Sequence, residues 1–160
     1  MRLWLSVLVF MLFATVQNVS ALNIEGVELQ EELSADGTSL YLVGGGVRSK
    51  FFMDLYVGSL YTEKGEESVG LVMHGAGKAI IRLDIISGMI TSEGFDNATE
   101  GQTEPIKSEI EAFIGVFKDE IKVGDSFVFV ADGGQVRVVK NDAETLTIDN
   151  PSLRSALFGI

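Results

Sequence analysis

Two adjoining segments decide the fold class: Leu42-Val43-Gly44-Gly45-Gly46-Val47-Arg48 and Phe51-Phe52-Met53-Asp54-Leu55-Tyr56-Val57-Gly58-Ser59-Leu60-Tyr61. The first continues a run of β-forming residues into three glycines, and the second is apolar at nearly every position. Such a continuous apolar run predicts a strand covered on both faces and antiparallel to the strand before it. Glycines at the end of the earlier strand indicate a bulge or the close approach of another backbone. Their spacing matches neither the Walker nor the dinucleotide pattern, so a phosphate-binding loop is the weaker alternative.

The remaining sequence predicts further strands around one helical layer. Alternating apolar residues over 22–33 indicate one or two strands, and the apolar residues of segment 78–85 indicate another strand. Apolar residues recur at helical spacing over 103–121. Three short strands separated by turn signals follow over 127–148, and Asn150-Pro151 begins a last helix. This order predicts an α+β domain whose largely antiparallel sheet is covered on one face by helices.

The composition excludes several classes of function. The 160 residues contain 12 Lys and Arg against 23 Asp and Glu, which gives a formal net charge of −11. This charge repels nucleic acid and anionic lipid headgroups unless a local basic patch compensates, and the sequence has no run of Lys or Arg. Cysteine is absent, and the single histidine, His74, is interpreted as an exposed or capping residue. We therefore expect neither a metal nor a cofactor.

The N-terminal segment is typical of a secretory signal peptide. Met1-Arg2 is basic, an apolar run extends to Val16, and Val19-Ser20-Ala21 supplies small residues for cleavage after Ala21. The run is shorter than the roughly 20 residues that a membrane-spanning helix needs. We therefore expect a signal peptide over residues 1–21 and export to the periplasm or the medium. An uncleaved anchor is the alternative.

The single domain expected after cleavage spans residues 22–160. It ends in Ala156-Leu157-Phe158-Gly159-Ile160, an apolar helix end with only Gly159 as a stop signal. This ending predicts that the domain is truncated at its C-terminus. Asn97-Ala98-Thr99 has the spelling of a glycosylation sequon, which matters only in a eukaryotic secretory pathway.

Arg48 is the main candidate for a functional side chain. It lies between the glycines and a very apolar strand, where a guanidinium is costly to desolvate unless an anion meets it. Two partners remain open at this point. An internal Asp or Glu would form a structural ion pair, whereas a ligand carboxylate or oxyanion would be held by two hydrogen bonds. Tyr56 lies close in sequence and can present a hydroxyl to the same cleft.

The sequence from Leu42 to Tyr61 resembles the signature of the chalcone isomerase-like family, L-x-G-x-G-V-R followed by Y-V-A-x-L-Y. Further matches follow in the family's order: Lys78 to Leu83, Thr91-Ser92-Glu93, Phe113 to Phe117, and Val123-Gly124-Asp125 before the last strands. The resemblance implies an open-faced β-sandwich. In this fold a large antiparallel sheet is covered by a helical layer, with a ligand cleft between them.

The resemblance also implies roles for individual residues. In the plant isomerases of the family, the Arg that matches Arg48 polarises a carbonyl while a phenolate adds to an enone. The family's catalytic Thr aligns with Tyr56, and its catalytic Tyr falls near Thr91 or Ser92, so a hydroxyl is kept at each place with a changed identity. Non-enzymatic members keep the Arg and bind fatty acids by the carboxylate. They imply a ligand site formed by Arg48, Gly46, Val47, Tyr56 and Phe113.

Three functions follow, in order of preference. The first is non-catalytic binding of a fatty acid or a similar small amphipathic carboxylate by an exported domain, with Arg48 on the anion. The second is an isomerase, an intramolecular lyase for a phenolic ligand, in which Arg48 stabilises an enolate and Tyr56 or Thr91 donates a hydrogen bond. The third is an interaction module in which Arg48 pairs internally. None of the three involves nucleic acid.

Overall fold

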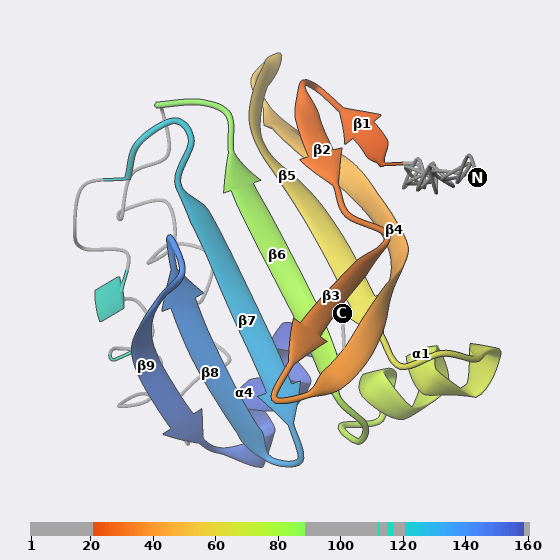
Figure 1. Cartoon of the computed structure of the whole chain (residues 1–160). Helices are drawn as coiled ribbons and strands as arrows, with labels where there is room; N and C mark the ends of the chain where they lie inside the picture. The colour runs from red at the N-terminus through yellow and green to blue at the C-terminus, as the bar shows by residue number, and fades with distance from the viewer. Residues whose placement is uncertain (1–20, 89–111, 113–114, 117–120, 159–160) are drawn as a thin grey trace, which may run out of the picture.

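The computed structural model describes residues 21–88, 112, 115–116 and 121–158 (Figure 1). The signal peptide predicted over residues 1–21 therefore lies outside the described residues except for Ala21. The segment 91–101, most of the helix predicted over 103–121, and residues 159–160 also lie outside them. The domain limits and the C-terminal truncation stay predictions.

A meander of antiparallel strands forms the body of the protein. Within the described residues seven strands pair in sequence order, each antiparallel to the next. They are β3 (Glu32–Ala35), β4 (Thr38–Lys50), β5 (Met53–Thr62), β6 (Ala79–Ile85), β7 (Ser126–Asp132), β8 (Gln135–Lys140) and β9 (Ala143–Asp149). A separate hairpin of β1 (Leu22–Ile24) and β2 (Val27–Leu29) contacts β4. The antiparallel sheet predicted from the sequence is confirmed.

Two helices are complete within the described chain, α1 (Glu66–Met73) between β5 and β6 and α4 (Pro151–Phe158) after β9. Asn150 caps α4 as predicted, because its Oδ1 accepts hydrogen bonds of 2.9 and 3.1 Å from two backbone N–H groups of the first turn. Arg154 of α4 is fully buried. Its Nη2 donates hydrogen bonds to the carbonyl oxygens of Ala76 and Gly77 at 2.6 and 2.8 Å, which ties α4 to the loop after α1.

The main core lies on the face of the sheet that α4 covers. Alternate residues of the strands meet there with side chains of the helices. The cluster includes Phe127, Phe129, Val136 and Val138 of the sheet together with Val72, Leu153 and Phe158 of the helices. Val116 and Ile121, from the segment predicted as a helix, pack against the same cluster. The structure thus has the α+β, open-faced arrangement that the sequence and the resemblance predict.

The opposite face carries a second and smaller core. Its buried members are Ala35, Leu40, Tyr61, Ile80 and Val130. The sheet is curled, and β3 with the adjoining half of β4 lies in front of β6 and β7 in Figure 1. The small core fills the inside of this curl.

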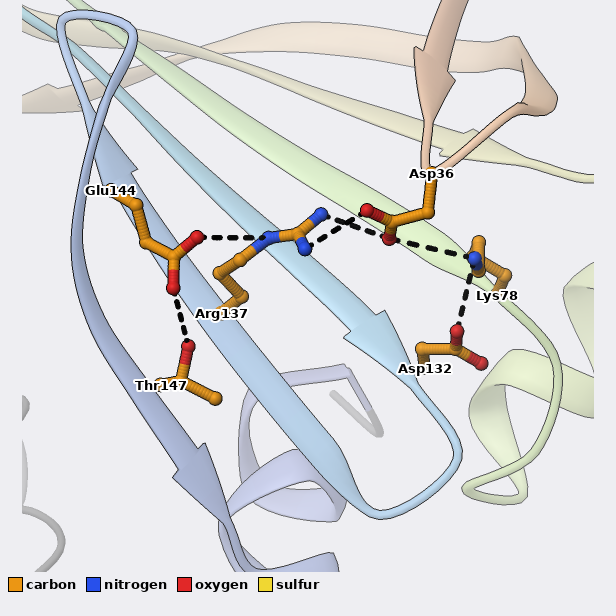
Figure 2. A network of polar contacts seen from close by, with 6 residues as sticks. All are labelled: Asp36, Lys78, Asp132, Arg137, Glu144 and Thr147. Atoms are coloured by element: carbon orange, nitrogen blue, oxygen red, sulfur yellow. Dashed lines mark hydrogen bonds and ion pairs between the residues drawn. The ribbon is translucent and has the colours of Figure 1, made fainter.

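A network of charged side chains closes the curl (Figure 2). Arg137 of β8 donates hydrogen bonds of 3.0 and 2.9 Å to the two carboxylate oxygens of Asp36, in the turn between β3 and β4. Lys78 Nζ lies 3.6 Å from Oδ2 of Asp36 and 2.9 Å from Oδ2 of Asp132. Glu144 extends the network into β9, where it accepts a hydrogen bond from Thr147. Side chains of strands that are not neighbours in the sheet are thereby joined.

The glycines lie inside β4, whereas the sequence placed them at the end of a strand. β4 runs through the glycines to Lys50, and it pairs with β5 both before and after them. The register shifts between Leu42 and Gly44 and again between Arg48 and Ser49. A Cβ on Gly45 would lie only 2.5 Å from Cδ1 of Leu29, so the β1–β2 hairpin packs directly on this backbone. The bulge and the close approach that the glycines indicate are therefore both present.

Phe51 and Phe52 form a turn, although the sequence assigned them to a buried strand. Lys50 and Met53 are the last register pair of β4 and β5, and the two phenylalanines connect them. Their φ angles are 51° and 67°, and both side chains are exposed. The prediction of continuous burial is wrong at this point, because an apolar pattern does not reveal a turn built from residues that rarely form turns.

Candidate functional site

Arg48 and Tyr56 are register partners on β4 and β5. Directly opposed residues of an antiparallel pair project from the same face, with Cβ atoms about 5 Å apart. Tyr56 is half-buried and packs against the main core, which places both residues on the helix-covered face. The structure therefore places Arg48 and Tyr56, the two residues that the sequence singled out, opposite each other on one face.

Arg48 is exposed and available to an anion. Within the described residues its guanidinium makes no ion pair or side-chain hydrogen bond. The sequence left open an internal Asp or Glu as partner, and the described part of the chain provides none. The expected cost of desolvation does not arise either, because the side chain is accessible to water.

Glycines leave a bare strip of backbone beside this pair. Gly46 and Gly58 are register partners next to Arg48 and Tyr56 on the same face, and Gly44 continues the strip along β4. Among the described residues, a Cβ on Gly44 or Gly46 would meet no heavy atom within 4 Å. A Cβ on Gly58 would lie 3.7 Å from Cε2 of Tyr56, so the ring stands beside the strip. The surface above β4 is therefore open.

The bare strip leads into an apolar cleft of about 420 Å³ between the sheet and the end of α4, and this cleft is largely open to solvent. This volume is within the range of about 300–1,000 Å³ that is usual for small-molecule sites. At about 3.4 Å per residue, Arg48 and Gly44 are about 14 Å apart along β4. The cleft is lined by Val43, Gly44, Gly45, Gly58, Ser59, Leu60, Ile81, Leu157 and Phe158. The site thus has a cation at one end and an apolar surface at the other.

The predicted site residues are only partly brought together. Arg48, Gly46 and Tyr56 lie side by side on the helix-covered face. Val47 pairs with Val57, so it projects from the opposite face of the sheet. Thr91 and Phe113 lie outside the described residues.

The sequence did not single out the apolar end of the cleft. The predicted ligand site did not include Ile81, Leu157 or Phe158, which line this end. One signal was present in the spacing of Gly44 and Gly46, because alternate residues of a strand share a face. Two glycines at this spacing indicate one bare face, provided that the strand continues through them.

Two arginines on the face of the sheet opposite Arg48 form ion pairs that shift their pKa values. Hydrogen bonds of 2.9 and 2.7 Å to Asp84 raise the pKa of Arg82 above its ordinary value. Hydrogen bonds to Asp36 likewise raise the pKa of Arg137. Each of these guanidinium groups has its own carboxylate, in contrast to Arg48.

The described part of the chain contains no group of three or more His, Cys, Asp or Glu side chains that could hold a metal ion. It also contains no helix that is long and apolar enough to cross a membrane. His74 is exposed at the C-cap of α1, and its Nδ1 lies 2.7 Å from the carbonyl oxygen of Gly70. The capping role predicted for this histidine is confirmed.

Comparison with known proteins gives a family and a fold. A family model described as chalcone isomerase-like matches residues 21–160. Among solved structures, a fatty-acid binding protein of Arabidopsis thaliana is similar, with a TM-score of 0.63 and 18% sequence identity over 82% of this chain and 83% of that chain. A search of curated protein sequences finds no match. The structural likeness shows a shared fold, and the family match covers all of the described residues, so the chain belongs to the chalcone isomerase-like family.

Proposed function

We propose that the protein binds a fatty acid or a similar small amphipathic carboxylate, with the carboxylate at Arg48 and the alkyl chain in the apolar cleft. One observation carries the proposal. A bare glycine strip connects the exposed guanidinium of Arg48, which has no partner among the described residues, with an apolar cleft on the same face of the sheet. The similar fold of a fatty-acid binding protein supports the same class of ligand.

The two ends of such a ligand contribute in different ways. Hydrogen bonds to a charged group contribute about 1.5–3 kcal/mol. Each buried methylene contributes about 0.8 kcal/mol. Several methylenes in the cleft therefore supply most of the affinity, whereas Arg48 discriminates an acid from the corresponding alcohol.

The first prediction is that Arg48→Gln weakens the binding of a long-chain fatty acid by about 10- to 100-fold, because it removes the charge-assisted hydrogen bonds. Displacement of a fluorescent fatty acid measures this change. Gly46→Leu tests the path, since a side chain there fills the open strip. Lys64→Gln is the matched control, because it removes an exposed positive charge that lies near Tyr41, and neither residue lines the cleft.

Binding of the fatty alcohol gives a second check. Arg48→Gln is expected to bring the affinities for the acid and the alcohol close together, with circular dichroism unchanged. Equal affinity of the wild type and Arg48→Gln for the acid would contradict the proposal. An equal loss of affinity in Lys64→Gln would mean that the effect of Arg48→Gln comes from the change in net charge and not from a contact with the carboxylate.

The second candidate function is an isomerase acting on a phenolic enone. The observation that favours it is the register pairing of Arg48 with Tyr56, which places two hydrogen-bond donors side by side. Such donors stabilise a developing enolate without a metal. Turnover of a chalcone by the wild type, lost in both Arg48→Gln and Tyr56→Phe, would establish it.

We place either activity outside the cytoplasm. The support is the sequence of residues 1–21, which has the composition of a secretory signal peptide. N-terminal sequencing of the protein recovered from an exporting host tests cleavage after Ala21.

A further inference from the structure

The turn between β4 and β5 breaks a rule that other hairpins of this protein follow. Two-residue turns with positive φ at both central residues favour Asn, Asp and Gly. Glu25-Gly26, Asp36-Gly37 and Asn141-Asp142 each contain such residues, with φ between 49° and 81°. Phe51-Phe52 has the same form, with φ of 51° and 67°, but consists of two aromatic residues. A break in local turn chemistry without a gain in packing points to function.

Both aromatic rings project into solvent. The exposed fractions are 78% for Phe51 and 107% for Phe52, the two largest among the exposed large apolar residues described. Met53, the next residue in the sequence, is 37% exposed. Val123 is 63% exposed and lies in a loop whose backbone is hydrogen-bonded to Ile85 at the end of β6. Figure 1 shows this loop at the same end of the sheet as the β4–β5 turn. We call Phe51, Phe52 and Met53 the apolar tip.

Basic residues lie directly behind the apolar tip. Arg48 and Lys50 are exposed on β4, and Nζ of Lys50 lies 5.6 Å from the centre of the Phe51 ring. Asp54, the acidic residue at this end of the hairpin, accepts a hydrogen bond from Ser49. The end of the hairpin therefore has a net positive charge on a chain whose formal net charge is −11. This local excess of one positive charge is not visible in the composition of the whole chain.

We propose that the apolar tip docks on an anionic lipid bilayer, with Phe51 and Phe52 in the interfacial region and Lys50 and Arg48 among the headgroups. Exposed aromatic rings suit the interfacial region, and neighbouring basic side chains add attraction to anionic lipids. A stable protein–protein interface needs about 800 Å² from each partner, whereas two phenylalanines present about 300–500 Å². A fluid bilayer accepts a narrow protruding turn without a complementary pocket.

The docking does not depend on the proposed ligand. The apolar tip contributes no residue to the lining of the cleft. Arg48 takes part in both proposals, but a substitution of Phe51 and Phe52 leaves it unchanged, so bilayer binding and fatty acid binding can be measured separately.

The second prediction is tested by co-sedimentation with vesicles of pure phosphatidylcholine and of equal parts phosphatidylcholine and phosphatidylglycerol. We expect the wild type to bind the anionic vesicles and to dissociate as salt is raised. Phe51→Asn combined with Phe52→Gly is expected to weaken binding by at least about tenfold, since two aromatic side chains no longer insert. Lys50→Gln is expected to weaken binding less and to reduce its salt dependence.

The matched control is Leu71→Ser combined with Met73→Ser. These two apolar residues are also exposed, at 51% and 55%, but lie on α1 at the other end of the sheet (Figure 1). We expect this variant to bind vesicles like the wild type. The N-terminal segment is the same in all variants, so a difference between them is due to the substituted residues.

Three results of the vesicle experiment would overturn the docking proposal. They are no binding of the wild type to anionic vesicles, unchanged binding of the tip variant, and equal loss in the α1 control. Self-association that needs the tip but no vesicles, seen by sedimentation velocity, would assign the tip to a second copy of the chain and also overturn it. Fatty acid displacement without vesicles is expected to be unchanged in the tip variant, which separates this result from the proposed function.

Discussion

At the scale of single residues, the Phe51-Phe52 turn combines positive φ angles with two residues that rarely adopt them. A residue other than glycine in the left-handed region costs roughly 1–2 kcal/mol. Asn and Gly adopt this region more readily, and Asn141-Asp142 shows an ordinary composition for the same turn between β8 and β9. The two phenylalanines are therefore retained at a cost to stability.

The third prediction follows from this cost. Phe51→Asn combined with Phe52→Gly is expected to raise the free energy of unfolding by about 1 kcal/mol, because both residues then suit a positive φ. Urea unfolding followed by circular dichroism measures the change. A loss of stability would mean that the two rings pack on the fold, in contradiction to their exposure.

Individual residues were predictable where a local chemical rule applied. Asn150 as helix cap and His74 as an exposed capping residue follow from side-chain chemistry, and the structure confirms both. Arg48 was recognised from its setting, although the structure shows it exposed rather than buried. The turn at Phe51-Phe52 was not predictable, because it contradicts the turn preferences on which such a prediction rests.

At the scale of elements, neighbouring glycines of β4 have different tasks. Gly45 faces the β1–β2 hairpin, where a Cβ would lie 2.5 Å from Leu29 Cδ1 and 3.1 Å from the carbonyl oxygen of Gly58. Gly46 faces the open strip, where a Cβ would meet no atom of the described part of the chain within 4 Å. One glycine permits packing, and the next keeps the path to the cleft clear.

The fourth prediction compares these two positions. Gly45→Ala is expected to lower the free energy of unfolding by about 1–3 kcal/mol, because an extra methyl group forces apart a packed contact. Gly46→Ala is the matched control and is expected to be neutral or slightly stabilising, since alanine restricts the unfolded chain. Thermal unfolding of both variants checks this. Equal effects would refute the assignment of Gly45 to packing.

The sequence predicted the strands better than their ends. Alternating apolar residues and turn signals correctly indicated the strand meander from β7 to β9. The glycines of β4 were assigned to a strand end because glycine weakens an isolated strand. Pairing with β5 on one side and packing by the β1–β2 hairpin on the other keep the strand continuous, and neither contact is visible from local sequence.

At the scale of the whole molecule, the curl of the sheet depends on contacts between strands that are not neighbours. Asp36 is held by Arg137 and Lys78, from β8 and from the start of β6 (Figure 2). The hydrogen bonds from Arg137 are the main cause that lowers the pKa of Asp36 below its ordinary value of 3.8. The unfolded chain lacks these partners and keeps the ordinary value.

The fifth prediction concerns acid. A carboxyl group with a lowered pKa in the folded state stabilises the fold fully above its ordinary pKa, and this contribution is lost as the pH falls through the lowered value. Asp36→Asn tolerates the positive φ of this position but cannot ionise. The difference in unfolding midpoint between wild type and Asp36→Asn is expected to be constant near neutral pH and to shrink below pH 3.8. A difference that stays constant into acid would show that the charge of Asp36 does not contribute.

The overall architecture was within reach of the sequence, and the curl was not. The α+β class, the largely antiparallel sheet and the helices on one face follow from periodicity and from the resemblance to the family. The second core and the Asp36–Arg137 pair join residues far apart in sequence. Only the three-dimensional course of the sheet brings such residues together, and so no local pattern predicts them.

The bare strip of backbone has a consequence for selectivity. A pocket lined with side chains is narrowed or widened by replacing one shape with another, and neighbouring groups repack. Gly44 and Gly46 begin with no side chain and with free space above them. Each can therefore be replaced in turn by Ala, Val and Leu, and each larger side chain leaves less space above the bare strip. The position of the first bulky residue along β4 would then set the length of the longest alkyl chain that fits between Arg48 and that residue.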